Sequence, residues 1–180
     1  MNEEEIAKIL TTDSFTRRNF RGVFAKDEFT IFSNLNSHQT FIVNTDNSNQ
    51  PGSHWVAFQF SGDYSCEYFD SYGFPPSFYG FDNVLKSYKI YMSNKRIQGY
   101  KSSVCGQYCV LFLLLRGRGY SYHDFMSFFH KNPAVNDHAT NNTLVIYVRK
   151  YGFENLINLV VHDDDFLKQY DVSRPYCVFD

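Results

Sequence analysis

Several residue types and patterns that mark particular protein classes are scarce in this 180-residue chain. It has one tryptophan, five prolines and four cysteines, which excludes a disulfide scaffold and a proline-rich chain. Its formal net charge of -2 excludes a surface that is basic throughout, as nucleic-acid-coating proteins have. The longest apolar run, at residues 110–115, is far too short to span a bilayer, so no membrane association is expected.

A secretory signal is also missing, because the chain opens with the acidic run MNEEE rather than with a basic and then apolar segment. We therefore expect an intracellular protein with reduced thiols. The cysteines stand at positions 66, 105, 109 and 177, and their spacings are not those of a zinc ribbon or a redox pair. Neither a metal ion nor a cofactor is expected.

Aromatic residues, in contrast, are abundant: 19 Phe and 14 Tyr bring the aromatic share to 19%. Together with 43% hydrophobic and 20% charged residues, this predicts a globular chain whose core is built largely from rings. The length suits a single domain over residues 1–180. Such a domain buries roughly 70% of its unfolded surface and needs no disulfide or metal for stability.

The pattern of apolar and turn-forming residues predicts an α+β fold. Strands are expected at residues 40–44, 54–60, 64–70 and 88–92. The SGD turn at 61–63 makes the middle two an antiparallel hairpin. Helices are expected at residues 3–10, 105–115, 122–130 and 140–151. The helix at 105–115 is apolar nearly all round, so we expect a small mixed sheet packed around it.

Cys105 stands at the predicted start of this central helix, after Ser103 as its expected cap. Unpaired backbone N–H groups and the positive end of the helix dipole favour a thiolate there, and the thiolate is the nucleophilic form of cysteine. Taken alone, however, Cys105 is better explained as a structural thiol, because free cysteine is among the most buried residue types.

His54 and Asp70 change that balance. His54 opens one strand of the predicted hairpin and Asp70 ends the other, so both should lie at the open end of the hairpin. An imidazole beside a carboxylate makes a general base and the group that orients it. Gln98, in a loop seven residues before Cys105, is then a candidate donor to an oxyanion, together with the Cys105 amide.

These residues lie within segments that resemble the adenovirus-type cysteine endopeptidases, the adenain family, which includes the proteases of Polinton/Maverick elements and virophages. The resemblance runs to about residue 115. It is carried by residues 22–24 with Asp27, then 42–45 (IVNT), 52–58 (GSHWVAF), 68–74 (YFDSYGF), 98–99 (QG) and 103–106 (SVCG).

The resemblance implies a papain-like fold of the ubiquitin-like-protease clan, with a central helix on a mixed sheet. It makes His54 the general base, Asp70 the acid that orients it, and Cys105 the nucleophile, with Gln98 in the oxyanion hole. The family cleaves precursor proteins of the virus particle after small residues such as glycine. Such a role places the protein in the host cell and the virion, as a monomer.

We expect the substrate to bind as an added strand beside Gly52 and Ser53, next to Trp55, where backbone must approach Cys105 closely. Gly106, also without a side chain, leaves room for the same approach. Asn44, at the end of its strand, is a further candidate for this groove. The competing explanation is that Gly52 only serves the turn after Pro51.

Three departures from the adenovirus pattern bear on activation. Adenovirus members carry Glu where this chain has Asp70, the residue used by the SUMO-protease relatives. They bind an activating peptide through a disulfide, but the corresponding residue here is Ser87, so only a non-covalent peptide activator fits. They are also basic and use DNA. Here an acid-free stretch at 84–123 permits weak DNA binding, although a solvated mixed surface is the better explanation, and residues 163–165 are acidic.

Three other functions compete with a virion-maturing endopeptidase. A ubiquitin-like-modifier protease shares the triad and the preference for glycine, but typically has one residue fewer between its Gln and its Cys. An acyltransferase of the same clan is a second alternative. A binding module is the third, and it would not require four chemically matched residues in this order.

Overall fold

The computed structural model describes residues 1–29 and 38–150 and has an α+β architecture. Its strands are β1 (Phe20–Phe24), β2 (Gln39–Asn44), β3 (Trp55–Ser61), β4 (Ser65–Phe69) and β5 (Lys89–Tyr91). Its helices are α1 (Glu3–Thr12), the 3-10 helix η1 (Pro76–Tyr79), α2 (Asp82–Leu85), α3 (Cys105–Gly117), α4 (Tyr122–Ser127) and α5 (Pro133–Lys150).

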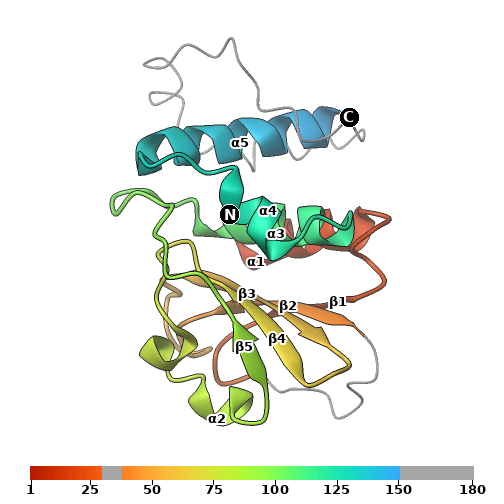
Figure 1. Cartoon of the computed structure of the whole chain (residues 1–180), viewed down its shortest axis with the longest axis vertical. Helices are drawn as coiled ribbons and strands as arrows, with labels where there is room; N and C mark the ends of the chain where they lie inside the picture. Colours follow the sequence, from red (N-terminus) through yellow and green to blue (C-terminus); the bar gives the residue numbers. More distant parts are fainter. Residues whose placement is uncertain (30–37, 151–180) are drawn as a thin grey trace.

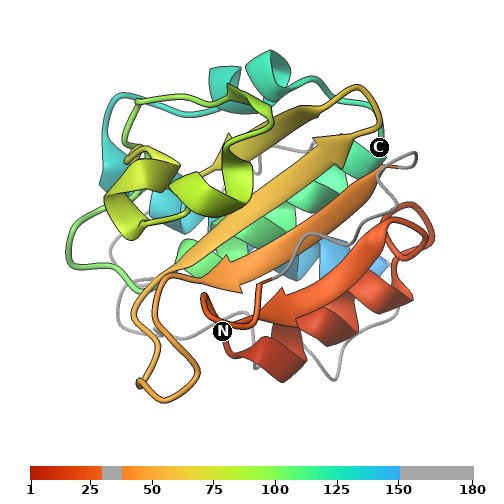
Figure 2. The same ribbon diagram turned by 90° about the horizontal axis from the view of Figure 1, so that it is seen from below.

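The five strands form one mixed sheet in the order β1-β2-β3-β4-β5. The β1–β2 and β4–β5 pairs are parallel, while β2, β3 and β4 are joined antiparallel. Helices α1, α3 and α4 cover one face of the sheet, and α5 lies over α3 on the side away from the sheet (Figure 1). The opposite face carries η1 and α2, as the view from below shows (Figure 2).

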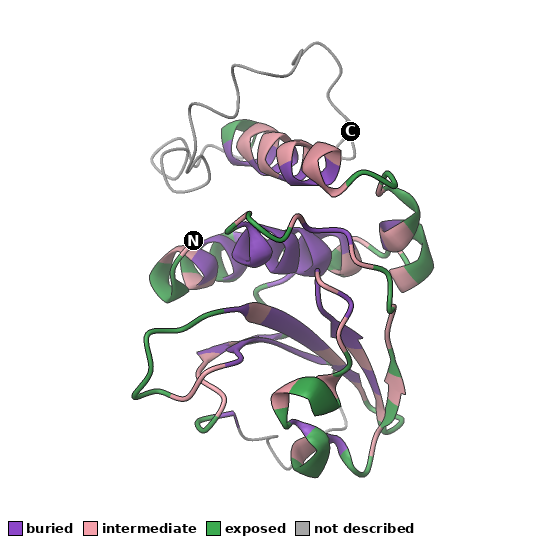
Figure 3. Cartoon of the chain, turned by 90° about the vertical axis from the view of Figure 1, so that its left-hand side faces the viewer, coloured by how far each residue is buried: buried purple, intermediate pink, exposed green. Residues whose placement is uncertain are grey.

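Helix α3 is the buried centre of this arrangement. Every residue from Cys105 to Leu115 is buried, and Figure 3 shows the helix between the sheet and α5 with almost no exposed surface. The ring of Phe112 stacks on Phe69 of β4 with centroids 4.9 Å apart and meets Phe125 of α4 edge-on at 5.2 Å. The helix is apolar on all sides because neighbours cover it on all sides.

A second core fills the other face of the sheet. Phe41 and Phe58 are fully buried there, and Phe29 packs against both, stacking on Phe58 at 4.8 Å. Phe81, just before α2, closes this core edge-on at 5.3 Å from Phe58. Because both faces of the sheet are covered, β2 is buried at every position instead of alternating. The abundance of Phe therefore serves two cores rather than one.

The predicted α+β fold with a small mixed sheet around a buried helix is confirmed, and most predicted elements lie within two residues of those observed. The hairpin of β3 and β4 is antiparallel as expected. Strand β1 was not predicted, because FRGVF contains Arg and Gly and pairs in parallel with a distant segment. Among the described residues, no helix is long and apolar enough to cross a membrane.

Three predictions about helix ends differ from the structure. Helix α4 ends at Ser127 instead of residue 130. Pro133 was expected to mark a stop before a helix at 140–151, but it is the first residue of α5. Proline is favoured at that position because its missing N–H would have no partner there in any case. The predicted cap Ser103 is wrong as well: the N-cap of α3 is Val104, and no side chain bonds to the helix start.

We expect Phe112→Ala to lower the free energy of unfolding by about 3–5 kcal/mol, because it removes a ring from the contact of α3 with both the sheet and α4. Urea unfolding followed by circular dichroism measures the loss. Phe78→Ala is the control, since that side chain is 64% exposed. Equal stability losses for the two variants would contradict the central role of α3.

Candidate active site

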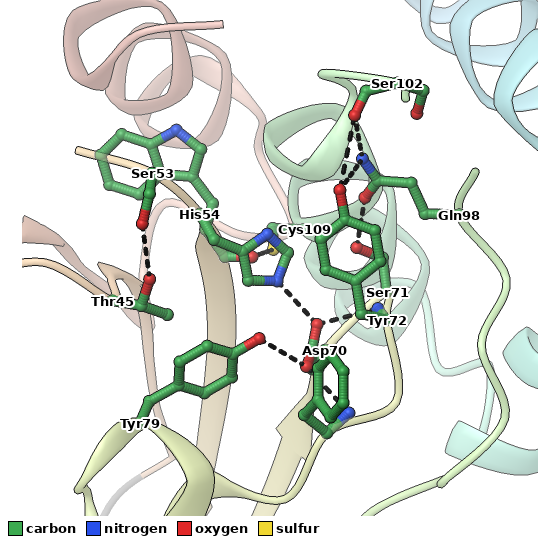
Figure 4. A network of polar contacts seen from close by, with 12 residues as sticks. Thr45, Ser53, His54, Asp70, Ser71, Tyr72, Tyr79, Gln98, Ser102 and Cys109 are labelled. Carbon is green, nitrogen blue, oxygen red and sulfur yellow. Dashed lines mark hydrogen bonds and ion pairs between the residues drawn. The ribbon is translucent and has the colours of Figure 1, made fainter. Parts of the chain in front are cut away.

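The open end of the β3–β4 hairpin brings His54 and Asp70 together. His54 directly precedes β3 and Asp70 directly follows β4, and the antiparallel register pairs Ala57 with Phe69 just inside them. His54 Nε2 lies 2.7 Å from Asp70 Oδ1, and both side chains are buried (Figure 4). The strand ends thus produce the imidazole–carboxylate pair that the turn position predicts.

Asp70 has a full set of hydrogen-bond donors besides His54. The backbone N–H of Tyr72 donates to Oδ1 at 2.9 Å, and that of Phe74 donates to Oδ2 at 3.0 Å. The Tyr79 hydroxyl donates to Oδ2 at 3.2 Å. These bonds fix the plane of the carboxylate, so Asp70 can hold the imidazole in one orientation.

Cys105 is the first residue of α3 and is 8% exposed. Since no side chain caps this helix, its first N–H groups remain available to the sulfur. Burial raises the pKa of the Cys105 thiol, but a hydrogen bond with His54, its positive charge, and the backbone N–H groups of Trp55 and Gly106 lower it below the usual range overall. The site therefore favours a thiolate.

The neighbouring groups also shift the pKa of the His54 imidazole. Burial lowers the pKa of His54, but hydrogen bonds to Asp70 and Cys105 and the negative charges of both outweigh it and raise the pKa to about 9. Because Nε2 is taken by Asp70, Nδ1 is the nitrogen left to exchange a proton with the sulfur. Thiolate and imidazolium stabilise each other, which is the reactive form of a Cys–His pair.

Aromatic rings enclose this pair, and sequence reasoning did not single them out. Tyr72 stacks on the His54 ring with centroids 4.7 Å apart, and Tyr79 lies 5.8 Å from it on another side. Exposed Tyr100 continues the stack beyond Tyr72. The aromatic density of YGFPPSFYG after Asp70 was the available signal, but it does not tell which ring meets the imidazole.

Gln98 is fully buried and lies beyond Tyr72 as seen from His54 (Figure 4). Its Oε1 accepts a hydrogen bond of 2.5 Å from the Ser71 hydroxyl. Its Nε2 donates to the Ser102 carbonyl at 2.9 Å and approaches the Tyr72 hydroxyl at 3.4 Å. One amide hydrogen is therefore firmly committed, and the other, near Tyr72, is held only weakly.

The segment expected to border the substrate is a turn organised by Asn44. Asn44 Oδ1 accepts hydrogen bonds from the N–H groups of Asp46 at 2.9 Å and Ser53 at 3.3 Å. Gly52 has a φ of 83°, and a Cβ there would lie 2.9 Å from Asn44 Nδ2. Only glycine fits this left-handed position, so the turn itself already accounts for Gly52.

A hollow of about 480 Å³ opens beside this turn. Asn44, Gly52 and Trp55, three of the four residues expected to bind substrate, line it. The fourth, Ser53, is exposed, follows Gly52 in the chain and contacts the Thr45 hydroxyl at 3.4 Å. The hollow lies beside the turn, and Cys105, His54 and Gln98 are not among the residues that line it.

Gly106 requires a correction, since it was expected to leave room for substrate. A Cβ at this position would lie 3.2 Å from Met1, 3.3 Å from the ring of Trp55 and 3.5 Å from Ile6. The missing side chain thus lets α3 pack closely against α1 and β3. Gly106 is explained by internal packing, not by access for a peptide.

The other described cysteines lie in apolar surroundings. Cys109, one turn further along α3, is fully buried, and burial raises its pKa well above the usual range. Its thiol donates to the Trp55 carbonyl at 3.3 Å. Burial likewise raises the pKa of Cys66 above the usual range. Of these three thiols, only Cys105 has a lowered pKa.

The acid-free stretch does not present all its cations to solvent. Arg116 forms a bidentate ion pair with Glu67 at 2.6 and 2.8 Å. Arg118 pairs with buried Asp13 at 2.7 Å. The charges of Arg116 and Arg118 are therefore neutralised by carboxylates of the same chain. The acidic run at 163–165 lies outside the described residues.

Comparison with known proteins gives this geometry its context. A model of the adenovirus endoprotease family matches residues 20–145. The chain belongs to that family. A protease of Frog adenovirus 1 (strain ATCC VR-896) is 33% identical over 110 residues, which cover 52% of this chain and 53% of the relative. The chain therefore spans about half the length of the curated relative it matches.

A solved structure shows the likeness in fold. The crystal structure of an ASFV protease aligns with a TM-score of 0.50 at 21% identity, covering 72% of this chain and 62% of the other. The family match spans the sheet, α3 and most of α5, so it includes every residue of the site described above.

Limiting iodoacetamide at pH 7 should alkylate Cys105 before Cys109 and Cys66, because its lowered pKa leaves a thiolate while the other two remain protonated. With His54 protonated up to a pH of about 9, this reactivity should fall only as the pH drops through the lowered thiol pKa. His54→Ala should move the midpoint upward, toward that of a free thiol.

Mass spectrometry of the labelled peptides measures both the order and the midpoint. Leu111→Ala, within the same helix but away from the thiol–imidazole pair, serves as the control and should leave the midpoint unchanged. Earlier labelling of Cys109 would reverse the roles assigned to the two cysteines.

Proposed function

We propose that this protein is a cysteine endopeptidase that cleaves precursor proteins after small residues such as glycine. The observation that carries the proposal is the buried bond of 2.7 Å between His54 Nε2 and Asp70 Oδ1, beside the start of α3, where His54 lowers the pKa of the Cys105 thiol. Nucleophile, base and orienting group meet at the end of a hairpin, in the relation that acyl transfer requires.

The chemistry follows from the two nitrogens of His54. The Cys105 thiolate attacks the carbonyl carbon of the scissile bond, and a C–S bond forms while the carbonyl electrons move to oxygen. The proton on His54 Nδ1 passes to the amide nitrogen of the substrate, the C–N bond breaks and the amine leaves. His54 then takes a proton from water, the hydroxide attacks the thioester, and the thiolate departs from a carboxylic acid.

Asp70 contributes orientation and charge. Its Oδ1 holds Nε2 at 2.7 Å, which leaves Nδ1 free to exchange protons in both halves of the reaction. Tyr72 covers the ring and excludes water from the bond between His54 and Asp70.

The developing oxyanion needs donors close to Cys105. In the proposed mechanism its own backbone N–H, at the uncapped start of α3, is one donor. Gln98 supplies the second through the Nε2 hydrogen that the Tyr72 hydroxyl holds only weakly, and the substrate oxygen replaces that hydroxyl as its acceptor. The bond of Gln98 to Ser102 stays in place and keeps the amide plane fixed.

The substrate lies as an extended segment along the hollow beside Gly52 and Ser53. A small residue before the scissile bond fits because the substrate backbone must approach Cys105 closely. Family membership supports virion precursor proteins as the natural substrates and the host cell and virion as the location.

A ubiquitin-like-modifier protease is the second candidate, and it would also cleave after glycine. The seven-residue step from Gln98 to Cys105 favours the adenovirus type, because modifier proteases typically have one residue fewer. Incubation with glycine-ended modifier fusions and with a library of unstructured peptides separates the two. Cleavage of modifier fusions alone would favour the second candidate.

Cys105→Ala should abolish peptide cleavage while leaving the unfolding midpoint nearly unchanged, since it removes only the sulfur. Cys109→Ala is the matched control on the same helix and should remain active. Library profiling of the wild-type protein should show glycine before the cleaved bond. Wild-type turnover by Cys105→Ala, or a preference for bulky or charged residues there, would contradict the proposal.

Cleavage should proceed without DNA, with at most a modest gain at low ionic strength. Arg116 and Arg118 are paired internally, so only five of the seven cations of the acid-free stretch are left for phosphate contacts, on a chain of net charge -2. Turnover is measured with and without duplex DNA at low and at physiological salt. An absolute need for DNA, or activation that persists at physiological salt, would show that other cations form a DNA site.

A further inference from the structure

The loop that carries Gln98 is fastened by side chains from the start of α5, which follow it by almost forty residues in the chain. The Gly99 N–H donates to Asp137 Oδ2 at 3.1 Å. Asn136 Nδ2 donates to the Ile97 carbonyl at 3.0 Å. Gln98 thus stands between two residues that α5 holds by their backbone.

Asp137 is 5% exposed, and both its oxygens are used. The hydroxyl of Tyr108, on α3, donates to Oδ1 at 2.9 Å, while Oδ2 takes the Gly99 N–H. Burial raises the pKa of Asp137, although hydrogen bonds from Tyr108 and Gly99 and the charge of Arg96 oppose it. A carboxylate that is costly to bury is kept here by donors from the Gln98 loop and from the nucleophile helix.

The fit at Gly99 is tight. A Cβ there would lie 2.8 Å from Asp137 Oδ2, closer than a carbon and an oxygen can pack. Glycine at 99 therefore allows the backbone to reach the carboxylate directly.

The opposite side of the loop rests on the strand end that holds the triad. The Ser71 carbonyl accepts hydrogen bonds from the N–H groups of Ile97 at 2.9 Å and Gln98 at 3.1 Å. The Ser71 hydroxyl donates to Gln98 Oε1. Ser71 follows Asp70 directly, so Gln98 is clamped between the triad on one side and α5 on the other.

We propose that Asp137 is a positioning residue for the oxyanion hole, which places Gln98 by holding the Gly99 backbone. This inference rests on the proposed function, because it gives Gln98 its role. Asp137 touches neither substrate nor sulfur. It sets how far the Gln98 amide lies from Cys105, by tying the loop both to α5 and, through Tyr108, to the helix that carries the nucleophile.

The test is a double-mutant cycle of Asp137→Ala with Gln98→Ala. Asp137→Ala removes both carboxylate oxygens, so the Gly99 N–H loses its acceptor. Asp137→Ala should lower kcat about tenfold with KM nearly unchanged, less than the roughly 100- to 1,000-fold expected for losing an oxyanion donor outright. In the Gln98→Ala background it should have almost no further effect.

Thr143→Val is the matched control. Thr143 is also buried on α5, but its hydroxyl bonds to the Ala139 carbonyl of its own helix, so kcat and KM should stay at wild-type values. Equal losses from Asp137→Ala in both backgrounds would overturn the proposal, since a residue that only supports the fold acts independently of Gln98.

Amide hydrogen exchange at Gly99 provides a measurement that does not need turnover. Exchange should be at least about tenfold faster in Asp137→Ala than in the wild type or Thr143→Val, because the Gly99 N–H has lost its acceptor. Gly99→Ala should reproduce the loss of kcat. Unchanged Gly99 exchange in the Asp137 variant would overturn the positioning role. If exchange is faster in that variant but the wild-type protein cleaves no peptide, the bond between Asp137 and Gly99 stands and the proposed function is contradicted.

Discussion

Burial of α3 on every side is the constraint on which the rest of this structure depends. A helix that is apolar all round needs a sheet on one face and helices on the others, and each of its neighbours is placed by that need. One end of such a helix must still emerge where backbone N–H groups can be satisfied. This end lies at Val104 and Cys105, opposite the open end of the β3–β4 hairpin. The packing of α3 therefore places the Cys105 thiol near His54 and Asp70.

The residues of the candidate site lie inside the fold. His54, Asp70, Gln98 and Cys105 are all buried. Low solvent access strengthens the electrostatic contacts between them, which is how an imidazole can keep its proton to a pH of about 9 beside a thiolate. The rings of Tyr72 and Tyr79 complete the enclosure.

Much of this arrangement could be predicted from local signals. The turn at 61–63 gives the hairpin register, and the register brings positions 54 and 70 to the same end, while the apolar run after Cys105 indicates a central helix. Long-range partners could not be predicted in this way. Nothing near Tyr72 in the sequence indicates that its ring stacks on His54, and nothing near Asp137 indicates that it bonds to Gly99.

The position of α5 in the chain has a consequence for synthesis. The groups that meet around the sulfur all precede residue 107, but the side chains of Asn136 and Asp137 that fasten the Gln98 loop come about thirty residues later. On the ribosome, Cys105, His54 and Asp70 are therefore made before the helix that fastens the neighbouring loop. Until α5 has been made, the Gln98 loop lacks the hydrogen bonds that Asn136 and Asp137 supply.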